Sequence, residues 1–385
     1  MKTEIIRKNI PKEWSHTKLG DILRIGSGKD YKHLGAGDIP VFGTGGYILS
    51  VDKELYDGET VCIGRKGTID KPFYFKGKLW TVDTLFYTYG YSRTTAKYIS
   101  HVFRNINWVY YNEASGVPSL SKSTIESIKI SLPPLPEQTR IVAVLETWDK
   151  AIELLSKKIA IKKVIKKGLM QELLTGCKRL KGFTDPWQST KLGDLCAISR
   201  GGSPRPIEAF LTNKKDGLNW LRIGDIQAGN RFIFSTKEKI IKEGLKKTTL
   251  VSPGDFILSN SMSFGRPYIM KIHACIHDGW LALKNLRKNI DKNYLYYKLS
   301  SQEVQNNFVS ISAGSGVQNL KKETVSALIL EIPSIPEQTA IADILTTADN
   351  EIEALEKKRK IIEQQKKFLL NNLITGRIRL PEFIH

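Results

Sequence analysis

The chain has 385 residues, a length that predicts two or three domains. Hydrophobic residues make up 41% of it, enough to bury cores, which argues against a disordered chain. It carries 59 Lys and Arg residues against 39 Asp and Glu, and the formal net charge of +20 favours a polyanionic partner, nucleic acid before a membrane surface. The four cysteines form no CxxC pair, the start of the chain is charged, and no apolar run approaches the roughly 18 residues of a spanning helix. The sequence therefore predicts a soluble, cytoplasmic protein without disulfides, signal peptide or membrane span.

Residues 1–135 are predicted to form a mixed α+β globule. Short β-rich runs alternate with Gly, Asn, Asp and Pro, as expected of strands joined by turns. The expected strands are Thr60–Ile63, Phe73–Phe75, Leu85–Tyr89 and Ile128–Leu132, and a helix is expected near Thr95–Arg104.

Residues 136–180 are predicted to form a long helix. Pro136 and Glu137 suit a first helical turn, and Gly176 suits the position after a helix C-terminus. Apolar residues recur between them with the 4-3 spacing of a coiled-coil seam. The seam residues are Ile141, Leu145, Trp148, Ile152, Leu155 and Ile159. About 39 residues at ~1.5 Å each give a helix of roughly 58 Å.

The second half of the chain repeats this order. Residues 181–335 are predicted to form a second α+β globule, and 336–385 a second long helix with a C-terminal tail. The expected strands are Asp255–Leu258, Tyr268–Ile272 and Leu328–Ile332, and a helix is expected near Asn293–Asn307. The second seam, in the register of the first, is Ile341, Leu345, Ala348, Ile352 and Leu355.

An internal duplication explains this order. WSHTKLGDI at Trp14–Ile22 recurs as WQSTKLGDL at Trp187–Leu195, an offset of 173. SGVPSL at Ser115–Leu120 recurs as SGVQNL at Ser315–Leu320, an offset of 200 that also relates the two long helices, identical at 22 of 45 positions. The second copy thus carries 27 more residues, all between the KLGD and SGV boxes, where the resemblance nearly vanishes. Two constant frames, each with a divergent insert, predict a pseudo-twofold arrangement with the helices antiparallel and their seams facing.

The basic excess lies mainly in the globules. Residues 1–135 have 19 basic and 13 acidic side chains, and 187–335 have 21 and 12, whereas 336–385 are balanced at 8 and 8. This favours DNA contact, because Lys and Arg displace the counterions condensed on phosphates. The alternative is a Lys-rich composition that implies no particular partner.

The KLGD openings and PxxPEQxxIxxxL helix starts make the chain resemble the specificity subunit of type I restriction-modification systems, over nearly its whole length. The best-matched stretches are Trp14–Ile22 with Trp187–Leu195, Leu132–Leu145 with Ile332–Leu345, and Leu173–Gly176 with Leu373–Gly376. The resemblance implies that each globule is a target-recognition domain reading one half of a split DNA site. The helices would be the ruler between them and would dock methyltransferase subunits.

The resemblance also implies a non-catalytic chain. Its partners would be double-stranded DNA, two methyltransferase subunits and, in a restricting system, translocase/nuclease subunits. No cofactor is expected here, because S-adenosylmethionine, Mg²⁺ and ATP would belong to those subunits. Two alternatives stay open: a coiled-coil adaptor whose globules bind protein and not DNA, and the specificity subunit of a modification-only system.

Glycine-rich loops with nearby cations are the candidate DNA contacts. PVFGTGGY (Pro40–Tyr47) and CIGRKGTIDKPF (Cys62–Phe73) look like recognition-domain loops, and FILSNSMSFGRPYI (Phe256–Ile269) is a diverged counterpart. Glycine lets a backbone approach phosphates, while Arg and Lys can bond phosphates or guanine edges. The candidates are Lys29, Thr44, Gly45, Arg65, Lys66, Lys71, Ser203, Arg205, Arg222, Ser261 and Arg266, and the alternative for each is an ordinary surface residue.

Catalytic and metal interpretations lack companion motifs. Phe42–Gly45 partly matches the FxGxG loop of adenine methyltransferases, but no [DN]PP[FY] motif accompanies it. His273, Cys275 and His277 alternate as ligands on a strand could, yet no fourth ligand cluster exists, so core packing is favoured and no metal site is predicted. The sequence contains no P-loop GxxxxGK[ST], which excludes an ATP-driven motor within this chain.

The length of the helices predicts a spacing. Roughly 58 Å corresponds to about 17 base pairs at ~3.4 Å rise, roughly one and a half turns of duplex. Because each globule would cover a few base pairs inward from its end, the unread gap between half-sites should be roughly half a turn to one turn. RLPEF at Arg379–Phe383 repeats RLKGF at Arg179–Phe183, which predicts that the chain end lies near the start of the first globule.

Overall fold

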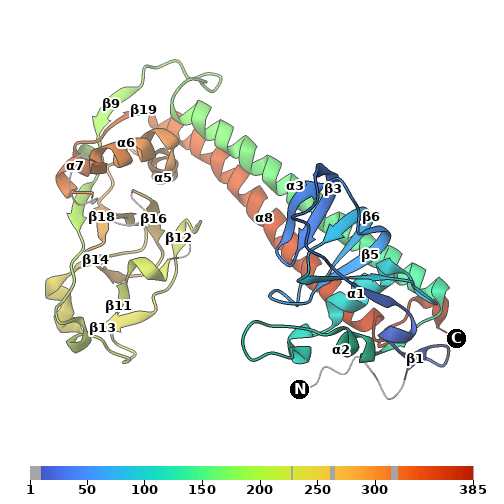
Figure 1. Ribbon diagram of the computed structural model, residues 1–385. Coiled ribbons are helices and arrows are strands. Elements are labelled where there is room, and N and C mark those ends of the chain that lie inside the picture. Colours follow the sequence, from blue (N-terminus) through green and yellow to red (C-terminus); the bar gives the residue numbers. More distant parts are fainter. Residues whose placement is uncertain (1–9, 227–228, 261–264, 314–319, 385) are drawn as a thin grey trace. The chain divides into compact units, whose positions relative to one another are not determined.

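The computed structural model describes residues 10–226, 229–260, 265–313 and 320–384, and the chain divides into two compact units. The first unit comprises Met1–Lys157 and Lys357–His385, and the second comprises Lys158–Glu356. Each unit contains one globule with half of each long helix, α3 (Leu135–Leu174) and α8 (Ile335–Leu373) (Figure 1). Within the described ranges, no helix is long and apolar enough to cross a membrane.

The first globule is built on a six-stranded sheet with the order β2-β7-β5-β6-β3-β4. Its neighbouring strands are antiparallel except for β3 and β6, which are parallel. Its strands are β2 (Arg24–Ser27), β3 (Ala36–Gly43), β4 (Gly46–Val51), β5 (Tyr56–Gly64), β6 (Phe73–Thr81) and β7 (Leu85–Tyr89). The three strands expected between residues 60 and 89 fall within β5, β6 and β7, so these predictions are confirmed.

A two-stranded ribbon and two helices complete the first globule. The ribbon pairs β1 (Ser15–Lys18) with β8 (Lys129–Leu132), which brings the KLGD box beside the strand that leads into α3. Helix α1 (Ala96–Asn105) starts where expected, because the Thr95 side chain accepts a hydrogen bond from the Tyr98 N–H. Helix α2 (Lys122–Ser127) follows the SGV box.

The second globule repeats the ribbon and distributes its other strands over two sheets. The ribbon pairs β9 (Gln188–Lys191) with β19 (Ile329–Ile332), and the sheets have the orders β10-β18-β15-β16-β12 and β13-β11-β17-β14. The strands are β10 (Ala197–Arg200), β11 (Leu218–Leu221), β12 (Phe232–Ile233), β13 (Glu238–Ile240), β14 (Thr249–Val251), β15 (Phe256–Ser259), β16 (Pro267–Met270), β17 (Ala274–Ile276) and β18 (Trp280–Lys284).

The helices of the second globule correct one prediction. They are α4 (Leu192–Leu195), α5 (Lys292–Ser300), α6 (Gln302–Ala313) and α7 (Lys322–Ser326). A single helix over Asn293–Asn307 is therefore wrong, because Ser301 between α5 and α6 has an extended backbone. The Ser301 hydroxyl instead accepts a hydrogen bond from the Val304 N–H at 3.3 Å and so caps α6.

The two globules share a hydrogen-bonded frame although their sequences diverge. In the first globule a three-residue turn, Val82–Thr84, precedes β7, which pairs with β5. In the second, His277–Gly279 precedes β18, which pairs with β15. These two turns are called the central turns. Leu85 N donates to Val82 O at 2.9 Å, and Trp280 N donates to His277 O at 3.0 Å. The two turns therefore share the same backbone hydrogen bond, from the residue after the turn to the first residue of the turn.

The frame extends to the SGV boxes. Arg65 N donates to Thr84 O at 2.7 Å in the first central turn, and Asn260 N donates to Gly279 O at 3.0 Å in the second. Leu120 N, at the end of the first SGV box, donates to Arg65 O (2.9 Å), and Leu320 N donates to Asn260 O (3.1 Å). Arg65 and Asn260 thus occupy equivalent positions in the two globules.

Within each unit, α3 and α8 lie side by side and antiparallel (Figure 1). Ion pairs that cross between them include Lys166–Asp349, Lys163–Glu356 and Lys162–Glu351 in the second unit and Lys366–Asp149 in the first. The pair in the first unit repeats Lys166–Asp349 at the offset of 200. The antiparallel helices expected from the duplication are confirmed.

The seam residues pack against the globules as well as along the helices. Ile141 and Leu145 belong to the core of the first unit, and Ile341 and Leu345 to that of the second. Of the other seam residues, Ile159 and Ile352 are buried, and Trp148, Ile152, Leu155, Ala348 and Leu355 are partly buried. The first turns of each apolar stripe therefore face a globule.

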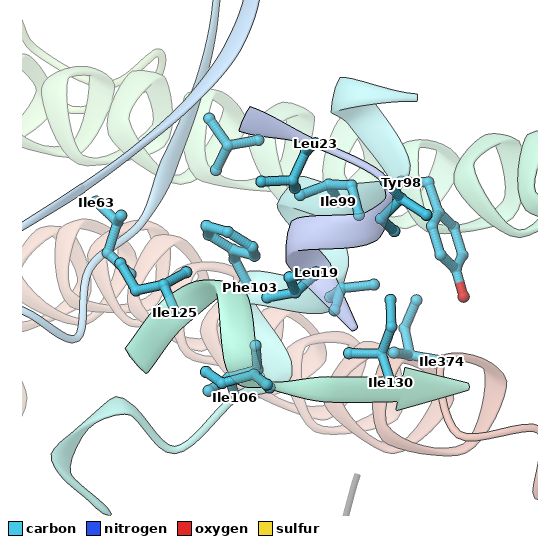
Figure 2. Packing of buried hydrophobic residues seen from close by; sticks show 14 of the residues in the cluster. Leu19, Leu23, Ile63, Tyr98, Ile99, Phe103, Ile106, Ile125, Ile130 and Ile374 are labelled. Carbon is cyan, nitrogen blue, oxygen red and sulfur yellow. The ribbon is translucent and has the colours of Figure 1, made fainter. Parts of the chain in front are cut away.

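The core of the first unit fastens the globule to both long helices (Figure 2). Leu19, Ile99 and Phe103 of the globule belong to one buried cluster with Ile374, just past the end of α8. The second core repeats this, since the end of α3 packs there with the start of α8.

The PEQ sequence that opens each long helix is buried, which its interpretation as a helix start did not anticipate. Glu137 is 1% exposed, and its carboxylate accepts hydrogen bonds from Arg379 Nε (3.0 Å) and Nη2 (2.9 Å) and from Trp14 Nε1 (3.0 Å). Glu337, also 1% exposed, accepts from Arg179 Nε (2.7 Å) and Nη2 (2.8 Å). Each helix start is therefore held by the arginine that follows the other helix.

The glutamine of PEQ fastens the same helix start to its globule. Gln138 accepts a hydrogen bond from Thr94 Oγ1 at 2.8 Å and donates to Arg93 O at 2.8 Å. Gln338 accepts one from Asp291 N, also at 2.8 Å. Both glutamines are fully buried.

The segment after α8 packs on the start of the first globule, as expected. Arg379 Nη1 donates to Glu13 at 3.0 Å, and a Cβ on Gly376 would lie 3.0 Å from Pro11. Gly176 and Gly376 have φ values of +74° and +65°, the left-handed conformation that commonly ends helices.

Replacing Arg379 by alanine is expected to destabilise the first unit by about 3 kcal/mol, because the buried Glu137 carboxylate loses its cation. Urea denaturation measures the loss of unfolding free energy, and hydrogen exchange of the amides at the start of α3 shows whether the loss lies there. The matched control is Arg140→Ala, since Arg140 pairs with the exposed Glu382 and should contribute little. Equal losses in the two variants would contradict the assigned role.

Candidate functional site

Two of the six candidates in the first globule sit directly on its central turn. Arg65 and Lys66 follow β5, and their backbone N–H groups both donate to Thr84 O, at 2.7 and 3.2 Å. The Arg65 guanidinium donates to Asp83 O at 3.4 Å and lies 5.9 Å from the centre of the Phe86 ring. Both cationic side chains are exposed, so they are available to an external anion.

Two further candidates lie beside this turn. Lys29 is exposed, and its N–H donates to Thr81 O, directly before the turn, at 2.8 Å. Thr44 begins the connection from β3 to β4, and its hydroxyl would lie 3.6 Å from a Cβ placed on Gly67, next to Lys66. Gly45 is exposed in the same β3–β4 connection, and Lys71 is exposed in the connection from β5 to β6.

The central turn of the second globule is held by side chains from three segments. Ser203 Oγ accepts a hydrogen bond from Asp278 N at 3.5 Å, and Arg205 Nη2 lies 3.8 Å from Asp278 Oδ2. Arg200 Nε and Asn260 Nδ2 both donate to Asp278 O, at 3.1 and 2.8 Å. The Arg205 side chain is 82% exposed, so its ion pair leaves most of the guanidinium open to solvent.

Arg222 lies next to the same turn. It follows Leu221, whose carbonyl accepts a hydrogen bond from His277 N at 3.1 Å. Its Nη1 donates to both carboxylate oxygens of Glu238 at 3.0 Å, so it faces an anion already present in the globule.

The two remaining candidates belong to the connection between β15 and β16. Arg266 is exposed, and its side chain hydrogen-bonds Tyr268. Ser261 lies outside the described residues.

His277 is part of the second central turn, and its protonation would add a positive charge there. Burial lowers the pKa of His277, and the positive charges of Arg222, Arg205 and Arg200 lower it further, whereas Asp278 acts in the opposite direction. A lowered pKa keeps the imidazole neutral near pH 7. The positive charge at this turn therefore comes from the three arginines.

Two residues at the second turn were missed by the sequence interpretation. Arg200 lies directly before Gly201 and Gly202, and this position could have been used as a signal. Asn260 carries no such signal, because its equivalence to Arg65 rests on backbone hydrogen bonds alone.

Of the alternating His and Cys residues, Cys275 is buried as core packing predicts, whereas His277 is partly buried. Cys275 packs with Trp220 and Ile240, and burial raises the pKa of its thiol to about 11, which disfavours a thiolate ligand. His273 is exposed. Among the residues that the structure describes, no group of three or more His, Cys, Asp or Glu side chains could hold a metal ion.

Comparisons with known proteins agree with the duplicated fold. The model of the family described as the type I restriction modification DNA specificity domain matches residues 11–163 and 184–364. The chain is 28% identical over 286 residues to the type I restriction enzyme MjaVIII specificity subunit of Methanocaldococcus jannaschii. That alignment covers 70% of this chain and 66% of the relative, so the chain spans about two thirds of its length.

Solved structures show the same fold at lower sequence identity. The S subunit of a type I restriction-modification system from M. genitalium matches with a TM-score of 0.63 and 14% identity, over 97% of this chain and 99% of that chain. A chain from a study of complex assembly and conformational transition of the type I R-M system matches with a TM-score of 0.65 and 17% identity, over 97% and 100%. Since the family model matches both halves of the duplication, this chain belongs to the family of type I restriction-modification specificity subunits.

Proposed function

We propose that this chain binds double-stranded DNA at a bipartite site, with each globule reading one half-site. The observation that carries the proposal is the pair of equivalent central turns, each surrounded by exposed Arg or Lys side chains. Cationic side chains on a fixed backbone frame can bond both phosphates and base edges in the major groove.

The shared frame also explains how the two half-sites can differ. The equivalent position is Arg65 in the first globule and Asn260 in the second. Arg65 is exposed and can reach a base edge. Asn260, in contrast, is 1% exposed and donates its amide to Asp278 O, so the second turn presents the exposed Arg205 instead. Reading two unrelated half-sites then requires only that the side chains on the frame change.

The long helices are proposed to serve as ruler and docking surface. Ile161 and Ile361, related by the offset of 200, are 59% and 53% exposed on α3 and α8. Exposed apolar residues at equivalent positions suit two identical partners. We assign these partners as two methyltransferase subunits, joined by translocase/nuclease subunits where the system restricts.

The remaining chemistry is assigned to those partners. S-adenosylmethionine would be bound by the methyltransferase subunits, and ATP and Mg²⁺ by the translocase/nuclease subunits. The assembly would act on cellular DNA in the cytoplasm. In a modification-only system the specificity subunit would have the same role.

Substituting Arg65 or Arg205 by alanine is expected to weaken DNA binding about 5- to 100-fold, each through one half-site only. The affinity of the wild type should fall steeply between 50 and 200 mM salt, because phosphate contacts release counterions. Fluorescence anisotropy gives the affinities, and sequencing of methylated adenines in cells that co-express the methyltransferase subunits gives both half-sites. Lys358→Ala, on α8, is the control. A wild-type chain without salt-dependent DNA affinity would favour the adaptor alternative.

Shortening the ruler is expected to change the gap and leave the half-sites intact. Removing four residues within 157–167 and four within 357–367 keeps the two copies matched. It shortens each helix by about 6 Å and rotates its end by some 40°. The methylated motif should then show a gap altered by one or two base pairs. Altered bases in either half-site would contradict the division into ruler and readers.

Substituting Ile161 or Ile361 by glutamate is expected to remove one methyltransferase subunit from the complex, and both together to remove two. Native mass spectrometry of the purified complex counts the subunits. The matched controls are Lys158→Glu and Lys358→Glu, which change exposed residues on the same helices. Complexes that retain both subunits in the double isoleucine variant would place docking elsewhere.

A further inference from the structure

The SGV box is repeated in the sequence, although much of its first copy does not pack against the globule. Ser115, Gly116 and Val117 recur as Ser-Gly-Val in the second copy, between globule segments that have diverged. In the first copy these residues are exposed: the Val117 side chain is 66% exposed, and a Cβ on Gly116 would meet nothing within 4 Å. Core packing therefore does not explain why the exposed half of the box is the same in both copies.

The other end of the box is fixed to residues 65–67, which follow β5. Leu120 is buried in the core of the first unit, and its N–H donates to Arg65 O at 2.9 Å. Gly67 N donates to Pro118 O at 2.8 Å, and Lys66 and Ser119 form an isolated antiparallel bridge. The box is thus held directly beside the two exposed cations of the first central turn.

A cavity of about 410 Å³ lies at this junction. Its lining includes three cationic side chains, Arg65, Lys66 and Lys122, and the serines 119 and 121. Lys122 is half-buried, and its counterpart at the offset of 200 is Lys322. Such a cavity suits a compact anion that also accepts hydrogen bonds.

One carboxylate also lines the cavity, and it is already engaged. Glu113 accepts hydrogen bonds from Thr124 Oγ1 and from Ser121 Oγ (2.7 Å) and N (3.3 Å). The Thr124 bond is the largest cause of a lowered Glu113 pKa, followed by the Ser121 bond, so the carboxylate stays ionised at neutral pH. Three cations against one carboxylate leave the cavity with a positive excess.

We infer that this cavity of the first globule binds a phosphodiester of the DNA backbone, as a subsite that does not read sequence. The inference rests on the proposed DNA-binding function and adds a division of labour to it. DNA offers bases, which differ with the sequence, and a phosphodiester, which does not. In the first globule Arg65 also reaches outward to the bases, and Lys122 with the SGV box beside it serves the phosphodiester.

Removing a cavity lysine is expected to weaken binding to every duplex alike. Lys122→Ala and Lys66→Ala should each lower affinity by the same factor, about 3- to 10-fold, for DNA with and without the recognised site. Each should also reduce the slope of log Kd against log salt by up to about 0.9. The control is Lys129→Ala, an exposed lysine of β8 that does not line the cavity. The methylated motif in cells should stay the same in all of these variants.

A charge placed in the cavity gives a second, independent test. Ser119→Asn introduces the residue that the second copy carries as Asn319 and should leave affinity nearly unchanged. Ser119→Asp has the same size but adds a negative charge, and it should weaken all duplexes alike. Circular dichroism confirms that both variants fold.

The outcomes separate this inference from the function on which it rests. If Arg65→Ala impairs DNA binding while the lysine and Ser119→Asp variants match the wild type, the subsite is wrong and the proposed function stands. A changed methylated motif in the lysine variants would make these residues base readers. Loss of methyltransferase subunits without loss of DNA affinity would make the box a protein contact. A wild-type chain that does not bind DNA would overturn both proposals.

Discussion

A buried carboxylate at the start of each long helix is the constraint on which each unit depends. Glu137 and Glu337 are almost inaccessible to water, a costly state for an ionised group unless a cation and hydrogen-bond donors surround it. Arg379 and Arg179 supply both in bidentate geometry. Because each arginine follows the other helix, the stable state of the carboxylate requires the two helices to lie antiparallel within each unit. The neighbouring glutamine then orients the globule on that pair.

The central turns show how a frame can persist while its surface changes. Backbone donors and acceptors hold Val82–Thr84 and His277–Gly279 in the same closure, so side chains at these turns are free to vary without loss of fold. Arg65 and Asn260 illustrate this freedom. The first uses its guanidinium on Asp83 O and the second its amide on Asp278 O, and the same carbonyl position is satisfied by two different chemistries.

Local periodicity and the duplication were enough to predict the two long helices, their antiparallel pairing within each unit and the last strand of each globule. Heptad spacing, Pro136 and the terminal glycines are signals that lie close together in the chain. The burial of Glu137 could not be predicted in this way, because its partner is 242 residues away. The break between α5 and α6 was missed because Ser301 caps α6 within a stretch whose sequence pattern is otherwise helical. The equivalence of Asn260 to Arg65 could not be predicted, because it rests on backbone hydrogen bonds, which leave no pattern in the amino-acid sequence.

The discontinuity of the first unit has a consequence for folding during synthesis. Lys158–Glu356 is one continuous stretch, so the second unit can be completed while the chain is still growing. The first unit needs Lys357–His385, and closing the 242-residue loop between Glu137 and Arg379 must wait until Arg379 has left the ribosome. The half of the protein that is made first is therefore finished last. Until then its helix start carries a carboxylate without its cation, exposed to water and to chaperones.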